Sequence, residues 1–62
     1  DLGEQIIQHL QTSGGQISLT DKSAPEEIYA VFKVSKKKYK QALGTLYKGK
    51  RVVLKPGVVE LV

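Results

Sequence analysis

Residues 23–48 read SAPEEIYAVFKVSKKKYKQALGTLYK, and this stretch decides the fold. Ser23 and Glu26 have the spacing of a capping box, and Pro25 suits a first helical turn. A helix is therefore predicted to begin here. Its apolar stripe is predicted to consist of Ile28, Val31 and Phe32.

A second helix is predicted after the tight break Lys33-Val34-Ser35. Ser35 is a candidate N-cap, and Val34 and Tyr39 have the spacing of a hydrophobic staple. Lys48-Gly49-Lys50 is predicted to end this helix. Two helices joined by so short a turn form a helix-turn-helix. The apolar face of the second helix is predicted to hold Tyr39, Ala42, Leu43, Leu46 and Tyr47.

The residues before this motif predict one more helix and a short strand. Gly14-Gly15 can supply the left-handed backbone that ends a helix. Gln16 to Leu19 alternate polar and apolar, as a half-buried strand does. The stripe of the first helix is predicted to be Leu2, Ile6, Ile7 and Leu10.

The residues after the motif predict a β-hairpin. Its strands are expected at Arg51 to Leu54 and at Val58 to Val62, joined by Lys55-Pro56-Gly57. Pro-Gly suits a type II turn, because glycine accepts the positive φ of the second central position. The side chains expected to point inward are Val52, Leu54, Val59 and Leu61. The complete order is helix, strand, helix, turn, helix and hairpin, which predicts an α+β winged helix.

The composition excludes several functional classes. There is no Cys and only His9, so we expect no disulfide, no metal site and no cofactor. His9 lies at the border of an apolar stripe, and no residues are arranged as a nucleophilic triad, so we expect no enzyme and no small-molecule substrate. No apolar run is long enough for a membrane span. Residues 1–62 are expected to be one domain, and the lack of Met indicates a piece of a longer protein.

The charges are separated along the chain. Nine of the ten basic residues lie between Lys33 and Lys55, and no acid lies between Ile28 and Val59. Residues 1–32 instead carry five acids and one lysine. Such a split is typical of a surface that meets a polyanion, and a solvated face that keeps the protein soluble is the alternative.

Three stretches resemble one bacterial family. They are DKSAPEEIY from Asp21, SKKKYKQALGTLYK from Ser35, and the closing VVELV from Val58. They are similar to the C-terminal domain of the conserved virulence factor B family. Lys33 departs from the pattern, because the family is expected to have glycine there. A left-handed Lys33 would cost about 1 kcal/mol relative to glycine.

The resemblance implies a cytoplasmic, non-enzymatic RNA-binding regulator of bacterial virulence or gene expression. In that family several OB-fold domains precede the winged helix, so this domain would be auxiliary to them. The implied partners are single-stranded or looped RNA and the other domains of the parent chain.

The candidate binding residues lie on the outward face of the second motif helix and around the hairpin. Gln41 could bond a base edge, and the basic residues could contact phosphates. A sequence-specific DNA regulator, with Gln41 and Thr45 reading bases, and an interdomain docking module are the alternatives. The candidate nucleic-acid-binding residues are Lys36, Lys37, Lys40, Gln41, Lys48, Lys50, Arg51 and Lys55.

Glycine and tyrosine positions add two expectations. Gly44 makes its helix roughly 1 kcal/mol less stable than alanine would at the same interior position. Either a partner approaches its bare backbone, or another element of the domain packs tightly against it. Tyr29, Tyr39 and Tyr47 have the spacing of core or core-edge residues, and exposed stacking by Tyr29 and Tyr47 is the alternative. We therefore expect contact with backbone more than with bases.

Overall fold

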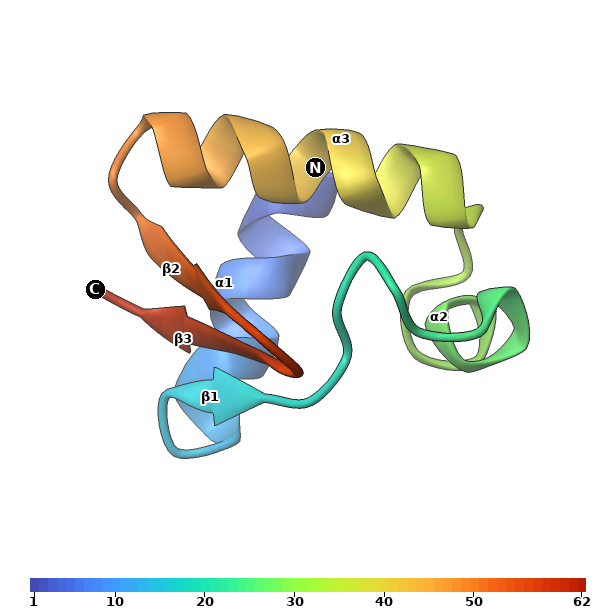
Figure 1. Cartoon of the computed structure of the whole chain (residues 1–62), viewed down its shortest axis with the longest axis horizontal. Coiled ribbons are helices and arrows are strands. Elements are labelled where there is room, and N and C mark those ends of the chain that lie inside the picture. The colour runs from blue at the N-terminus through green and yellow to red at the C-terminus, as the bar shows by residue number, and fades with distance from the viewer.

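The computed structural model describes residues 1–62 and confirms the α+β winged helix. The first and third helices pack against a small sheet, the second helix packs against those two helices, and the last two strands form the hairpin wing (Figure 1). The elements are α1 (Leu2–Thr12), β1 (Gln16–Ile17), α2 (Pro25–Phe32), α3 (Lys36–Lys48), β2 (Val52–Lys55) and β3 (Val58–Leu61).

Side-chain caps begin two of the three helices. The Asp1 carboxylate accepts a hydrogen bond from the Glu4 amide at 2.9 Å at the start of α1. The Ser35 hydroxyl accepts one from the Lys38 amide at 3.2 Å, so the predicted cap of α3 is confirmed. Each cap satisfies an amide that has no partner inside the helix.

The capping box predicted at Ser23 and Glu26 is wrong. Ser23 Oγ accepts a hydrogen bond from the Thr20 amide at 2.9 Å, and the Ser23 amide donates to the Thr20 carbonyl. This turn occupies the hydroxyl, and Ala24 is the N-cap of α2 without a side-chain bond. Pro25 limits the loss, because it has no amide to satisfy at the first helical position.

Helices α1 and α3 end in the same way with different residues. In α1 the amide of Gly15 donates to the Leu10 carbonyl at 2.8 Å, with Gly14 left-handed at φ 79°. In α3 the amide of Arg51 donates to Leu46 and that of Lys50 to Tyr47. These bonds define a Schellman motif. Its left-handed residue is Lys50, at φ 59°, although Gly49 precedes it.

Helix α2 also ends on a left-handed lysine. Lys33 has φ 61° and ψ 31°, which is the left-handed conformation considered for this position. Its ammonium nitrogen lies 5.6 Å from the centroid of the Tyr29 ring. A cation over an aromatic face is worth about 0.5–1 kcal/mol at an exposed site, which offsets part of the backbone cost.

The sheet has three antiparallel strands in the order β1-β3-β2. Strand β1 is shorter than predicted and pairs Gln16 with Glu60 and Ile17 with Val59. The wing turns at Pro56-Gly57, where Gly57 has the positive φ of 74° that a type II turn needs. Strand β3 is therefore central, and β2 is an edge.

The core consists of ten buried apolar residues from all three helices and the wing. Three residues predicted for inward faces are exposed: Leu54 is 42% exposed, Val31 is 44% exposed and Tyr47 is 55% exposed. Leu54 lies near the turn of the wing, where the hairpin extends past the helices. The buried residues are Ile6, Ile7, Leu10, Ile28, Phe32, Tyr39, Leu43, Leu46, Val52 and Val59.

Tyr39 ties α3 to the rest of the domain. Its side chain is fully buried, its ring stacks on Phe32 at a centroid distance of 5.2 Å, and its hydroxyl donates to the Leu19 carbonyl at 2.6 Å. Burial raises the pKa of Tyr39 to about 12, because the phenolate would lose its hydration. This anchor fixes which face of α3 turns outward.

Candidate functional site

The outward face of α3 carries a row of polar residues. Tyr39, Leu43 and Leu46 are buried on the inner face. At 100° per residue, Lys37, Gln41, Gly44 and Lys48 lie opposite them, with Lys40 on one flank. Lys37 and Lys48 are about 16 Å apart along the axis, at 1.5 Å per residue.

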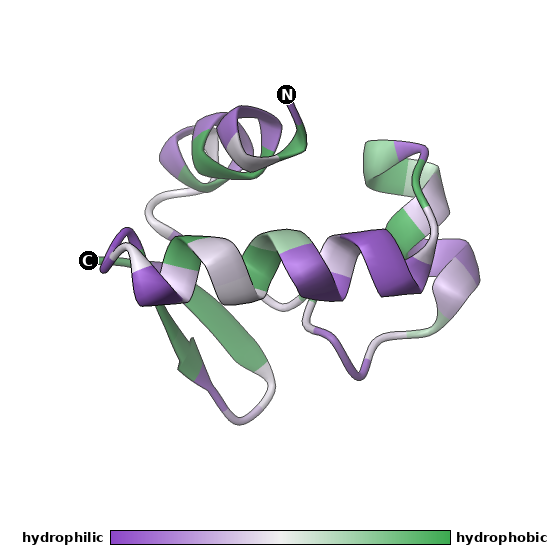
Figure 2. Ribbon diagram, turned by 90° about the horizontal axis from the view of Figure 1, so that it is seen from above, coloured by the Kyte–Doolittle hydropathy of each residue, from purple (hydrophilic) through white to green (hydrophobic).

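The basic side chains of α3 have no acidic neighbour along their own helix. Residues 36–48 contain no Asp or Glu, and the ion pair of the structure joins Lys55 to Glu60 at 2.9 Å. In Figure 2 purple dominates the N-terminal half of α3, which lies across the middle of the view. Lys37, Lys40, Gln41 and Lys48 are exposed, and Lys36 is half-buried. The face is therefore an uncompensated positive surface.

The N-terminus of α3 concentrates this charge. Lys36, Lys37 and Lys38 fill the first turn, which has no acidic residue. Each lysine costs a few tenths of a kcal/mol against the positive end of the helix dipole. An anion placed at this end would be attracted both by the dipole and by the lysines.

Gly44 packs against nothing within the domain. A Cβ atom built there would have no heavy atom within 4 Å outside its own helix turn. The alternative that another element packs tightly against Gly44 is therefore wrong. The bare backbone at Gly44 lies open in the middle of the polar row.

The other predicted site residues fall in three separate places. Lys50 lies beside Tyr47 and Lys48, around a hollow at the end of α3. Arg51 instead lines a hollow of about 210 Å³ with residues of α1, among them Glu4. Lys50 is left-handed at φ 59°, and it and Arg51 line different hollows.

Lys55 lies at the far end of the wing. It pairs with Glu60 on the neighbouring strand and borders a hollow formed with Asp21 and Lys22 of the loop before α2. An edge-strand lysine in this position discourages pairing with another strand. Its charge is partly compensated, unlike that of the α3 lysines.

Two tyrosines differ from the expected core packing. Tyr29 is 58% exposed and Tyr47 is 55% exposed, while Tyr39 alone is buried. Tyr47 lies about 70° around the helix from the centre of the buried face formed by Tyr39, Leu43 and Leu46. Helical spacing placed it on the apolar stripe, and its angular position was the signal that it could be exposed.

A hydrogen bond restricts Thr45, the second proposed base reader. Its hydroxyl donates to the Gln41 carbonyl at 3.1 Å, within the helix. The hydroxyl proton is therefore already engaged, and its oxygen can still accept. Gln41 is left as the exposed side chain of this row that can both donate and accept.

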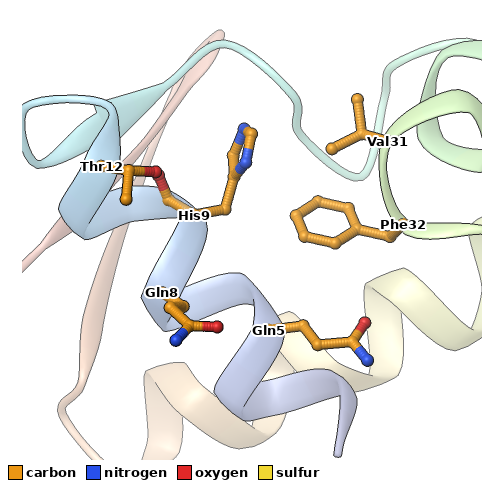
Figure 3. A pocket seen from close by; sticks show the side chains of 6 residues that line it. All are labelled: Gln5, Gln8, His9, Thr12, Val31 and Phe32. Atoms are coloured by element: carbon orange, nitrogen blue, oxygen red, sulfur yellow. The ribbon is translucent and has the colours of Figure 1, made fainter.

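His9 is a boundary residue, as expected. It is partly exposed, and its ring lies edge-on to Phe32 at a centroid distance of 5.4 Å. Figure 3 shows the two rings next to each other at the edge of an open hollow, with Val31 also from α2. The residues of α1 that line this hollow are Gln5, Gln8, His9 and Thr12.

No group of three or more His, Cys, Asp or Glu side chains is placed to hold a metal ion. None of the three helices combines the length and the apolar character that a membrane span requires.

Curated relatives share nearly the whole chain. Conserved virulence factor B of Staphylococcus saprophyticus is 38% identical over 61 residues, which cover 98% of this chain and 20% of the relative. The Staphylococcus aureus USA300 protein of the same name is 39% identical over the same share. The chain therefore spans about a fifth of the length of these relatives.

A solved structure and a family model agree with them. A multidomain protein with nucleic acid binding domains from Streptococcus pneumoniae TIGR4 superposes with a TM-score of 0.95 at 35% identity, over all of this chain and 22% of that one. The sequence model of the CvfB-like winged helix domain matches residues 4–61. The chain belongs to the family of CvfB-like winged helix domains.

Proposed function

We propose that this domain binds RNA through the outward face of α3, as a non-catalytic module of a longer cytoplasmic regulator. The observation that carries the proposal is the uncompensated row of exposed lysines on α3, which contains no acid. Lysine provides point charges for phosphates, and neutralising phosphates supplies most of the affinity of sequence-independent binding.

Relatives support the nucleic-acid partner. The superposed pneumococcal protein is described as having nucleic acid binding domains, and this chain corresponds to about a fifth of it. Other domains of the parent chain are therefore expected to bind together with this one. Linked modules raise the overall affinity without new contacts, so weak binding by one module is useful.

RNA is preferred to duplex DNA because of the family resemblance, which implies an RNA-binding regulator, and the side chains of α3 add support. The deep, narrow major groove of A-form RNA does not admit a helix, so the expected target is a single strand or loop lying along the basic face. Sequence reading of a DNA major groove needs several base-contacting side chains. Only Gln41 is free to both donate and accept on this row, because the Thr45 hydroxyl proton is engaged.

The test is a titration of the 62-residue chain with single-stranded RNA, hairpin RNA and duplex DNA at several salt concentrations. Four to six phosphate contacts predict a slope of log affinity against log salt of roughly −3 to −5. Tightest binding to duplex DNA would favour the DNA-regulator alternative. No binding to any of the three near 100 mM salt, which is about the physiological ionic strength, would refute both the RNA-binding and the DNA-regulator functions. Interdomain docking would then remain.

The double substitution Lys37→Glu, Lys40→Glu should abolish RNA binding without unfolding the domain. Both side chains are exposed, and surface changes usually shift stability by no more than about 0.5 kcal/mol. The matched control is Lys22→Glu, Lys33→Glu, which makes the same change in net charge at two exposed lysines outside α3. If both double variants lost affinity equally, overall charge and not α3 would explain the binding.

A further inference from the structure

An apolar hollow lies between the C-terminal end of α3 and the edge strand β2. Its volume is about 500 Å³, and four of its six lining residues are hydrophobic. In Figure 1 the C-terminus of the chain lies beside the start of β2, close to this end of α3. The lining residues are Tyr47, Lys48, Lys50, Val52, Val53 and Val62.

The hollow has a flat aromatic side chain at its rim. Tyr47 is 55% exposed, so much of its ring is open to a partner. Val52 is buried beneath, and Val53 and Val62 are exposed beside it. An exposed aromatic ring beside an apolar floor suits a flat, partly apolar group such as a nucleobase.

The charged side chains that line this hollow are both lysines. Lys48 and Lys50 are exposed, and neither forms an ion pair. Lys50 is held in the left-handed conformation at φ 59°, and its amide donates to the Tyr47 carbonyl at 3.0 Å. The backbone of the Schellman motif therefore fixes Lys50 on the same turn as Tyr47.

We propose that one base of a single-stranded RNA stacks on Tyr47, while Lys48 and Lys50 contact the phosphates that flank it. This proposal rests on the proposed RNA-binding function and adds a base-contacting subsite to it. A single strand is the fitting occupant, because bases in a duplex keep their faces inside the stack. The site would therefore favour bases without reading their identity, since every base has a face that can stack.

A second copy of the chain is a less suitable occupant. In a two-fold interface the same patch lies on both sides, so the lysines of one copy would lie close to those of the other. Like charges placed opposite one another oppose association. A single-stranded RNA instead complements the lysines with its phosphates and the apolar floor with its bases.

The experiment compares a 12-nucleotide uridine RNA with an abasic oligomer that has the same ribose-phosphate backbone. Fluorescence anisotropy would give the affinity of the unaltered chain, of Tyr47→Leu and of Tyr47→Phe. The matched control is Tyr29→Leu, which removes an equally exposed tyrosine on α2, far along the chain from the hollow. Thermal unfolding of each variant would check that it folds.

The proposal predicts that the unaltered chain and Tyr47→Phe prefer the uridine RNA by about five- to a hundredfold. Tyr47→Leu should lose that preference and retain its affinity for the abasic oligomer, and Tyr29→Leu should retain both.

Three results would overturn the subsite. They are equal affinity of the unaltered chain for both oligomers, an equal loss in the Tyr47→Leu and Tyr29→Leu variants, and a dimer in sedimentation that Tyr47→Leu dissociates. In the first case phosphate binding through α3 would still stand. Failure to bind either oligomer would instead refute the proposed function itself.

Discussion

Replacing Gly44 by alanine should stabilise the domain by about 1 kcal/mol. Glycine inside a helix is roughly 1 kcal/mol less favourable than alanine, because it loses more backbone freedom on folding. The added methyl group meets no heavy atom within 4 Å outside its helix turn, so no clash opposes this gain. For a domain of this size, the gain corresponds to a rise in Tm of about 4–8 °C.

The Gly57→Ala variant is the matched control. A methyl group added at Gly57 would likewise meet no heavy atom within 4 Å, but the φ of this residue is +74°. Alanine in a left-handed conformation costs about 1 kcal/mol or more, so the same chemical change should lower Tm by a similar amount. The pair differs in backbone conformation and not in steric contact.

Circular dichroism melting and urea unfolding would measure both variants. A lower Tm for Gly44→Ala would refute the reasoning, because it would mean that the site is covered or that α3 is irregular there. Affinity for single-stranded RNA gives an independent result. If RNA lies against the bare backbone at Gly44, Gly44→Ala should bind it more weakly although it is more stable. Unchanged affinity would contradict close approach at that point.

Further predictions concern the buried Tyr39 and the two lysines with left-handed backbone, Lys33 and Lys50. Tyr39→Phe should cost about 1–3 kcal/mol, because the Leu19 carbonyl loses its donor. Since the folded pKa of Tyr39 is raised to about 12 from 10.0, the contribution of the neutral tyrosine to stability should be complete below pH 10 and fall by roughly 2 kcal/mol by pH 12. Urea unfolding at pH 9 and pH 12 would measure this loss of stability. An equal loss in Tyr39→Phe, which has no phenol to ionise, would contradict the prediction. Lys50→Gly should stabilise the domain by about 1 kcal/mol, and Lys33→Gly by less, because Lys33 also loses its contact with Tyr29. Equal gains in thermal melts would show that the cation–π contact contributes nothing.

Local backbone chemistry made most of the fold predictable. Ser35 caps α3, Gly14 ends α1 and Pro56-Gly57 turns the wing, as their residue types predict. Each of these effects acts within a few residues of the chain. The failure at Ser23 has the same origin, because the nearby Thr20 amide competes for the hydroxyl that the capping box required.

Exposure was harder to predict than secondary structure. Alternation along β2 placed Leu54 inward, but the wing tip extends beyond the helices that would cover it. Helical spacing could not decide Tyr47, which lies at the edge of the apolar stripe. Both outcomes depend on how far neighbouring elements reach, and the spacing of apolar residues contains no such information.

Part of the candidate site was predictable from the regular geometry of a helix. The lysine row of α3 follows from the helix period, since Lys37 and Lys48 lie opposite the buried face. The sequence did not predict that Lys50 and Arg51 line different hollows. Glycine is the usual left-handed residue, but here Lys50 is left-handed and Gly49 keeps an ordinary φ of −80°. Whether these residues bind nucleic acid stays a prediction.

The position of β3 at the centre of the sheet has a consequence for synthesis on the ribosome. The strand pairs with β2, which is adjacent in the chain, and with β1, which is more than forty residues earlier. Closing that long separation costs chain entropy before any sheet contact is gained. A nascent chain that ends after α3 has its three helices but lacks Val59 and the strand that joins the two edges. Completion of the fold should therefore wait until translation has delivered the last strand, and folding should then proceed in one cooperative step.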